Sequence, residues 1–139
     1  MSTLLTVGAH PDDTSIFFGG TVAKHVADGW QVVSVTVTAG RGSPHSFEMA
    51  EDDLVARRHE ELEWESHRLG VRLEPFALEG VKDAASRAAC VARLVALMRE
   101  LRPDRLIMHN LNDSHATHVM CAKLALAGVV AAQREDPTL

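Results

Sequence analysis

The chain has 139 residues, of which 46% are hydrophobic and 24% charged, and its formal net charge at pH 7 is −5. This length suits one domain with a hydrophobic core, and the acidic balance excludes the strongly basic surface that binds nucleic acid or an anionic membrane. No run approaches the ~18 consecutive apolar residues of a membrane span, and the N-terminus lacks a basic segment followed by an apolar one. We therefore expect a cytoplasmic protein.

Apolar, β-branched runs alternate with helical segments along the whole chain. We predict strands over 3–7, 31–38, 71–78 and 105–109, and helices over 16–27, 50–69, 84–101 and 115–133. Helical connections between successive strands favour parallel pairing and right-handed crossovers. The expected fold class is α/β, a Rossmann-like three-layer sandwich with a mainly parallel sheet, formed by residues 1–139 as a single domain. Cys90 and Cys121 lie in helical runs, and we expect buried free thiols.

A histidine and two carboxylates follow the first predicted strand, in the turn His10-Pro11-Asp12-Asp13. In open α/β sheets, ligands bind at the carboxyl ends of the strands. An imidazole and carboxylates packed together there are costly unless a charged group compensates them, and a divalent cation is the simplest such group.

A second polar cluster, Asp113-Ser114-His115-Ala116-Thr117-His118, follows the fourth predicted strand in the same way. His115 and His118 are three residues apart and share a face if they lie on a helix. If strands one and four are neighbours, the two clusters meet in one crevice. Two or three nitrogen and oxygen ligands with one open position are typical of a catalytic zinc site.

Structural roles are the alternative for each cluster. Asp12 or Asp13 could cap a helix, and histidines at a helix start are commonly surface or capping residues. His25, His59 and His67 lie within predicted helices, and we expect them on the surface. His109 and His45 could reach the crevice, although a structural role is favoured for both. No dinucleotide fingerprint, phosphate-binding loop or G-x-S-x-G elbow is present.

At these residues the chain resembles the PIG-L/LmbE-like family of zinc-dependent N-deacetylases, which act in N-acetylglucosaminyl-phosphatidylinositol, mycothiol and bacillithiol pathways. The similarity rests on an ordered set of motifs: Ala9-His10-Pro11-Asp12-Asp13, Gly19-Gly20-Thr21-Val22-Ala23, Val35-Thr36-Val37-Thr38-Ala39-Gly40, Arg58-His59-Glu60-Glu61 with Leu69-Gly70-Val71, Arg102-Pro103-Asp104, and Asp113 to His118.

The resemblance implies a residue-by-residue assignment. His10, Asp13 and His118 would ligate Zn2+, with Fe2+ as the alternative metal. Asp12 would be the general base for a zinc-bound water, and His115 would stabilise the oxyanion or act as the acid. Arg58 matches a position lining the sugar site in some members, and Arg41 is expected to contact substrate as well. The implied reaction removes an N-acetyl group from an N-acetylglucosamine-type amino sugar or conjugate.

The chain departs from the family pattern in three respects. Thr14 replaces a glutamate, Ala116 and Thr117 replace a proline and an aspartate, and the usual C-terminal part is expected to be lacking. A sheet with a missing strand has an unpaired edge that favours association, so we expect a homo-oligomer. The same departures motivate a second hypothesis, a non-catalytic binding or assembly module that keeps the fold. A third hypothesis is a metal hydrolase of another amide, such as a thiol-conjugate amidase.

Overall fold

A computed structural model describes residues 1–41 and 49–139, and His45, in the loop after the second strand, lies outside them. The elements alternate regularly along the chain. They are β1 (Thr3–Gly8), η1 (Thr14–Phe18), α1 (Gly19–Ala27), β2 (Gln31–Thr38), α2 (Glu51–Leu69), β3 (Arg72–Leu78), α3 (Ala84–Leu101), β4 (Arg105–Met108) and α4 (Ala116–Glu135). The predicted strands and helices are confirmed to within a few residues of their ends, except that a π-helical turn, η1, precedes α1.

The four strands form one parallel sheet in the order β3-β2-β1-β4. β1 pairs with β2 on one side and with β4 on the other, so that Val7 lies opposite both Val35 and Met108. The chain therefore adds β2 and β3 on one side of β1 and then crosses over to add β4 on the other side. As the sequence suggested, β1 and β4 are neighbours, and this is the switch point at which α/β sheets bind ligands.

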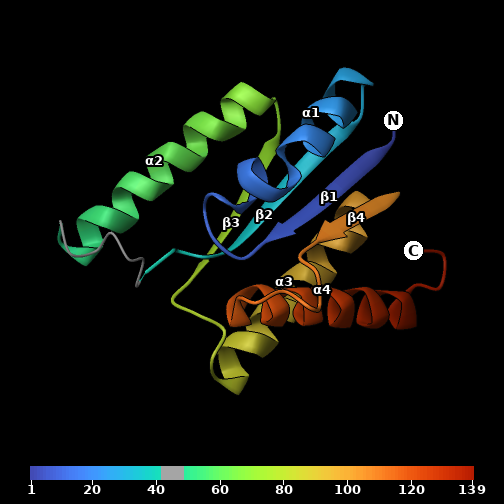
Figure 1. Cartoon of the computed structure of the whole chain (residues 1–139). Coiled ribbons are helices and arrows are strands. Elements are labelled where there is room, and N and C mark those ends of the chain that lie inside the picture. The colour runs from blue at the N-terminus through green and yellow to red at the C-terminus, as the bar shows by residue number, and fades with distance from the viewer. Residues whose placement is uncertain (42–48) are drawn as a thin grey trace.

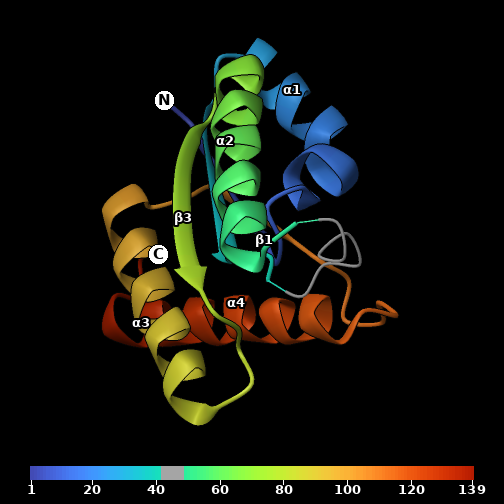
Figure 2. The same ribbon diagram turned by 90° about the vertical axis from the view of Figure 1, so that its left-hand side faces the viewer.

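Helices cover both faces of the sheet, which confirms the three-layer α/β architecture (Figures 1 and 2). Alternate residues of β1 face opposite layers: Leu4 packs with α1 residues such as Val22, whereas Leu5 and Val7 pack with α3 and α4. Both faces of β1 and β2 are buried. Strands buried on both faces read as continuous apolar runs, which is why these two were evident in the sequence.

The helix α4 packs against α3 and β1 and buries Cys121, Leu124 and Ala125. By length and composition alone it is apolar enough to cross a membrane. Its position in the layer beneath the sheet (Figure 1) accounts for that composition, because a helix packed against both a sheet and a helix needs a wide apolar surface.

One histidine departs from the expected burial. His25 was expected on the surface, yet it is buried: its Nδ1 donates to the Thr21 carbonyl at 2.7 Å and its Nε2 accepts from Arg105 at 3.0 Å. The partner Arg105 lies 80 residues away in sequence, so helical periodicity could not reveal it. Cys90 and Cys121 are buried and free, as predicted.

Candidate metal centre

The two polar clusters meet where β1 and β4 end. One cluster follows Gly8 at the end of β1, and the other follows Met108 at the end of β4. Because β1 and β4 pair in parallel, their carboxyl ends lie at the same edge of the sheet. This pairing brings His10 and His118, 108 residues apart in sequence, to 3.2 Å between Nδ1 and Nε2.

Asp13 is folded back onto the end of β1 and is almost fully buried. Its Oδ2 accepts backbone N–H groups from Ala9 at 2.8 Å and His10 at 2.7 Å, and a ring N–H from His109 at 2.8 Å. Burial alone raises the pKa of Asp13, but the hydrogen bonds from His10 and His109 hold it well below its usual range. Asp13 is therefore an anion, and its side chain makes no cap hydrogen bond to η1, so the capping alternative does not hold for this residue.

Gly8 makes this fold-back feasible. A Cβ placed at Gly8 would lie 3.0 Å from the Cβ of Asp13, closer than packed carbon atoms tolerate. The small residue at the end of β1 thus has a steric role, since it leaves the space that the Asp13 side chain occupies.

His118 is oriented by a carboxylate from its own cluster. Its Nδ1 lies 3.0 Å from Asp113 Oδ2, and because an ionised carboxylate only accepts hydrogen bonds, Nδ1 carries the proton. Hydrogen bonds from the His115 backbone N–H and from the His118 ring lower the pKa of Asp113. With the proton on Nδ1, the Nε2 of His118 is the nitrogen that faces His10 and Asp13.

Four donor atoms of three residues lie at about the separations that a tetrahedral cation requires. His10 Nδ1 lies 3.2 Å from His118 Nε2 and 3.5 Å from Asp13 Oδ2, and His118 Nε2 lies 3.5 Å from Asp13 Oδ1. Bonds of about 2.0–2.1 Å to zinc place neighbouring ligands about 3.3 Å apart. Asp13 Oδ2 is already engaged, which leaves Oδ1 for the cation. The donor set thus fits a divalent metal.

His109 belongs to the same cluster, although sequence reasoning favoured a structural role for it. With Asp13 and His118 it forms a second, fully buried set of potential ligands beside the set His10, His115 and His118. Its ring stacks on His118 at 3.9 Å between centroids and 11° between planes, and Phe17 contacts both rings edge-on. The sequence signal for His109 was its position. It directly follows β4, just as Ala9 directly follows β1.

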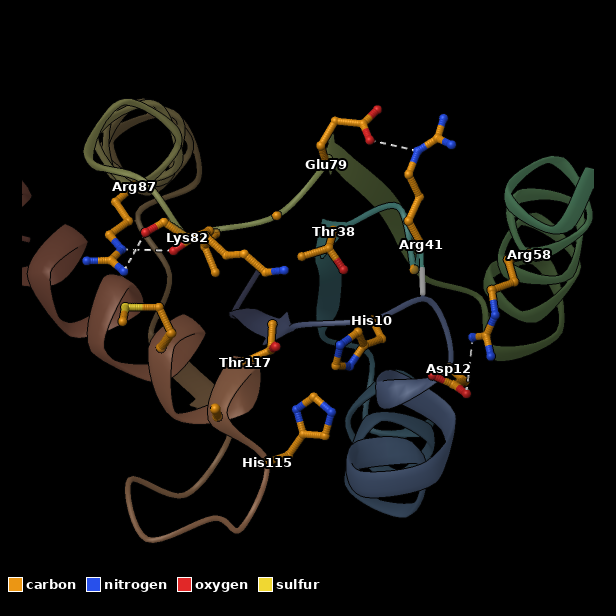
Figure 3. Close-up of a pocket in the computed structure, with 15 residues that line it drawn as sticks. His10, Asp12, Thr38, Arg41, Arg58, Glu79, Lys82, Arg87, His115 and Thr117 are labelled. Atoms are coloured by element: carbon orange, nitrogen blue, oxygen red, sulfur yellow. Dashed lines mark hydrogen bonds and ion pairs between the residues drawn. The ribbon is translucent and has the colours of Figure 1, made fainter. Parts of the chain in front are cut away.

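Asp12 and His115 lie beside His10 in the lining of a cavity (Figure 3), and both are more exposed than Asp13 and His118. Asp12 is half exposed and forms an ion pair with Arg58 at 3.3 Å. The His115 ring stacks on His118 and meets His10 edge-on, and it makes no side-chain cap to α4. Burial and the neighbouring imidazoles of His10 and His118 lower the pKa of His115, which favours its neutral form.

These residues open into a cavity of about 590 Å³. Its lining contains His10, Asp12, Thr38, Gly40, Arg41, Arg58, Glu79, Gly80, Val81, Lys82, Arg87, His115, Ala116, Thr117 and Met120. Both arginines expected at a substrate site, Arg41 and Arg58, line this cavity. Gly40, at φ +77°, fits against Pro11 and Arg58, where a Cβ would lie 3.0 and 3.1 Å from their side-chain carbons.

The positions that depart from the family pattern have defined surroundings. Thr14 is buried, and its hydroxyl lies 2.6 Å from that of Ser34 on β2. The two hydroxyl groups hydrogen-bond to each other, so neither is buried without a partner at the position where the family has a glutamate. Thr117 lines the cavity instead of an aspartate, and Asp113 orients His118.

Comparisons with known proteins agree with this geometry. A family model described as PIG-L, GlcNAc-PI de-N-acetylase, matches residues 5–129. The 1D-myo-inositol 2-acetamido-2-deoxy-alpha-D-glucopyranoside deacetylase of Rhodococcus opacus (strain B4) is 30% identical over an alignment of 159 residues, which covers 95% of this chain and 54% of that protein. The chain spans about half the length of the curated relatives it matches.

Two solved structures share the fold closely. GalB, the 4-carboxy-2-hydroxymuconate hydratase from Pseudomonas putida KT2440, has a TM-score of 0.85 and 27% identity over 98% of this chain and 59% of its own. N,N'-diacetylchitobiose deacetylase from Pyrococcus horikoshii has a TM-score of 0.84 and 26% identity over 97% of this chain and 52% of its own.

Proposed function

This chain belongs to the PIG-L family, and we propose that it acts as a metal-dependent hydrolase that removes an N-acetyl group from an N-acetylglucosamine-type amino sugar or conjugate. One observation carries the proposal: donor atoms of His10, Asp13 and His118 lie 3.2–3.5 Å apart beside a cavity that is lined by the Asp12 carboxylate. The named deacetylases among its relatives support the choice of reaction.

We assign the metal to His10, Asp13 and His118, and we favour Zn2+. Two histidines and a carboxylate suit a catalytic zinc and also Fe2+, so ferrous iron is the alternative. When bound, the cation supplies a Lewis acid that polarises the amide carbonyl and acidifies water. Asp113 and His109 act as positioning residues, because each hydrogen-bonds the outer side of a ligand.

Residues that line the cavity carry out the proton transfers. Asp12 takes a proton from the attacking water as the C–O bond forms, and returns it to the amine nitrogen as the C–N bond breaks, giving acetate and a free amine. Arg58, 3.3 Å from Asp12, holds that carboxylate toward the cavity. Neutral His115 donates a ring N–H to the oxygen that gains negative charge in the tetrahedral transition state. Arg41 and Arg58 border the space left for the sugar.

Three substitutions test these roles against one another. Asp12→Asn should retain bound metal and lose at least a hundredfold in kcat, because it removes the base without removing a ligand. His10→Ala and His118→Ala should lose the metal as well as the activity. The measurements are acetate release from N-acetylglucosamine conjugates and metal content by mass spectrometry. A metal-loaded Asp12→Asn protein with the wild-type rate would show that Asp12 is not the base.

A hydratase is a second candidate, favoured by the similarity to GalB. In that reaction the same groups would activate water for addition to a carbon–carbon double bond, and no C–N bond would break. Loss of the ultraviolet absorbance of 4-carboxy-2-hydroxymuconate, without acetate release from any amide, would favour this candidate. A thiol-conjugate amidase is distinguished by including such a conjugate in the substrate panel. A protein that binds no metal and turns over neither class would be a non-catalytic module.

We also propose a cellular location, an oligomeric state and a domain organisation for the enzyme. We place it in the cytoplasm, where thiols such as Cys90 and Cys121 stay reduced, and both are free in the structure. We propose a homo-oligomer, because β4 is an edge strand of the sheet. Residues 1–139 are proposed to form one domain, which sedimentation and light scattering of the purified chain would test together with the oligomeric state.

A further inference from the structure

The cavity beside the metal centre carries an excess of positive charge although the chain as a whole is acidic. Its lining includes four cationic side chains, Arg41, Arg58, Lys82 and Arg87, but the carboxylates of only two residues, Asp12 and Glu79. The chain has a net charge of −5. The lining of the cavity therefore has more cationic than anionic side chains, and a cleft with low-dielectric walls strengthens their field.

Both of these carboxylates are already paired with arginine. Arg58 lies 3.3 Å from Asp12, and Arg41 Nε lies 2.7 Å from Glu79. Arg41 Nη1 also lies 2.9 Å from Asp52 and 3.6 Å from Glu51, so the charge of Arg41 is fully compensated. These two ion pairs leave the charges of Lys82 and Arg87 without a carboxylate among the residues that line the cavity.

Lys82 is held so that its ammonium group points into the cavity. Arg87 donates from Nε to the Val81 carbonyl and from Nη2 to the Lys82 carbonyl, both at 2.8 Å. These two hydrogen bonds fix the backbone of Val81 and Lys82, from which the Lys82 side chain extends. Figure 3 shows the Lys82 side chain directed toward Thr38, across the cavity from the Asp12–Arg58 pair. No ion pair to Lys82 is formed within residues 1–41 and 49–139.

We infer that the substrate carries an anionic group, a carboxylate or a phosphate, which binds Lys82 while the N-acetyl group lies at the metal. This inference rests on the proposed function and adds a substrate class to it. A lysine ammonium is a compact charge that binds either anion. An acidic amino-sugar derivative would therefore span the cavity, with its amide beside Asp12 and its anion at the opposite wall.

The test compares three substrates of the zinc-loaded chain: neutral N-acetylglucosamine, N-acetylglucosamine 6-phosphate, and N-acetylmuramic acid, which carries a carboxylate. We expect at least one acidic substrate to have a KM about tenfold below that of the neutral sugar. Lys82→Gln should raise that KM about tenfold more than it raises the KM of the neutral sugar, and Lys82→Arg should restore most of the difference. The two acidic substrates distinguish phosphate from carboxylate.

Lys123→Gln is the matched control, because Lys123 is exposed on α4 and lies outside the cavity lining. It should leave all three KM values within twofold of wild type. Equal effects of Lys82→Gln on neutral and acidic substrates, or a wild-type enzyme that does not distinguish them, would overturn the inference.

Binding measured without turnover separates this inference from the proposed function. Calorimetry with the same three compounds on the Asp12→Asn chain should show tighter binding of the acidic compound and its loss on adding Lys82→Gln. If the acidic compound binds in this way but no compound is ever deacetylated, the proposed function fails and the anion site stands. If the compounds are deacetylated but Lys82→Gln affects the acidic compounds no more than the neutral sugar, the anion site fails and the function stands.

Discussion

The carboxylate of Asp113 accepts a hydrogen bond from His118 Nδ1 at 3.0 Å, and this contact sets which nitrogen of His118 faces the candidate metal centre. The same carboxylate accepts the His115 backbone N–H at 2.7 Å. One side chain thereby fixes the tautomer of a proposed ligand and the conformation of the turn that leads into α4.

Replacing Asp113 with asparagine should weaken zinc binding by about 10–100-fold, the usual cost of losing a carboxylate behind a ligating histidine. The amide can keep the shape of the side chain but loses the charge that strengthens His118 as a ligand. Competition with a chromogenic chelator measures the affinity. Asp53→Asn, an exposed change of the same kind on α2, is the control, and equal affinities of the two variants would contradict the role of Asp113.

The positioning role of His109 can be tested by comparing one replacement that can donate a hydrogen bond to Asp13 with one that cannot. His109→Phe removes the ring N–H that bonds Asp13 Oδ2 at 2.8 Å, and leaving a buried carboxylate oxygen short of a donor costs about 1–3 kcal/mol. We expect lower stability to urea together with weaker metal binding. His109→Gln keeps a donor and should recover part of both. Full metal affinity in His109→Phe would mean that the hydrogen bond does not position Asp13.

Two glycines offer a matched steric test. Gly8→Ala places a Cβ 3.0 Å from that of Asp13, so the carboxylate must move and bound zinc should fall sharply. Gly20→Ala meets no atom within 4 Å and lies in α1, where alanine is favoured over glycine by about 0.5–1 kcal/mol. Thermal unfolding should therefore show Gly20→Ala at or above wild type and Gly8→Ala below it. Unchanged zinc content in Gly8→Ala would refute the steric argument.

The two thiols should be unreactive in the folded protein at pH 8. Burial raises the pKa of Cys90 to about 11 and that of Cys121 to about 12, and only the thiolate attacks a disulfide reagent. Labelling with a chromogenic disulfide should be slow until denaturant exposes both thiols. Fast labelling at pH 8 without denaturant would be inconsistent with their burial.

The same pKa shifts make stability depend on alkaline pH. An unfolded thiol titrates near pH ~8.5, so unfolding releases protons above that pH. The stability that the protonated thiols contribute is fully present below pH ~8.5. It is lost as pH rises from there through the pKa values of the folded protein. Urea unfolding of wild type and of Cys90→Ala between pH 7 and pH 10 measures this slope, which should be shallower in the variant.

The sequence by itself determined the fold class and the location of the chemistry. The buried runs of β1 and β2 and the helical stretches between strands are local signals, because hydrogen bonding and side-chain direction within one element depend on near neighbours. The two polar clusters that contain His10, Asp13 and His118 were located for a similar reason, since polar groups directly after apolar strands mark the edge of an α/β sheet at which ligands bind. The choice of these three residues as ligands rests on the family resemblance.

Only the tertiary structure decided how those groups are connected. The positioning contacts of His109 and Asp113, the burial of His25 beside Arg105, and the projection of Lys82 across the cavity from Asp12 depend on strand order and helix packing. Three of these four relationships join residues about 70 to 100 positions apart. Such pairs leave no periodic trace in a single sequence, because the distance between them is set by the whole sheet and not by any segment of it.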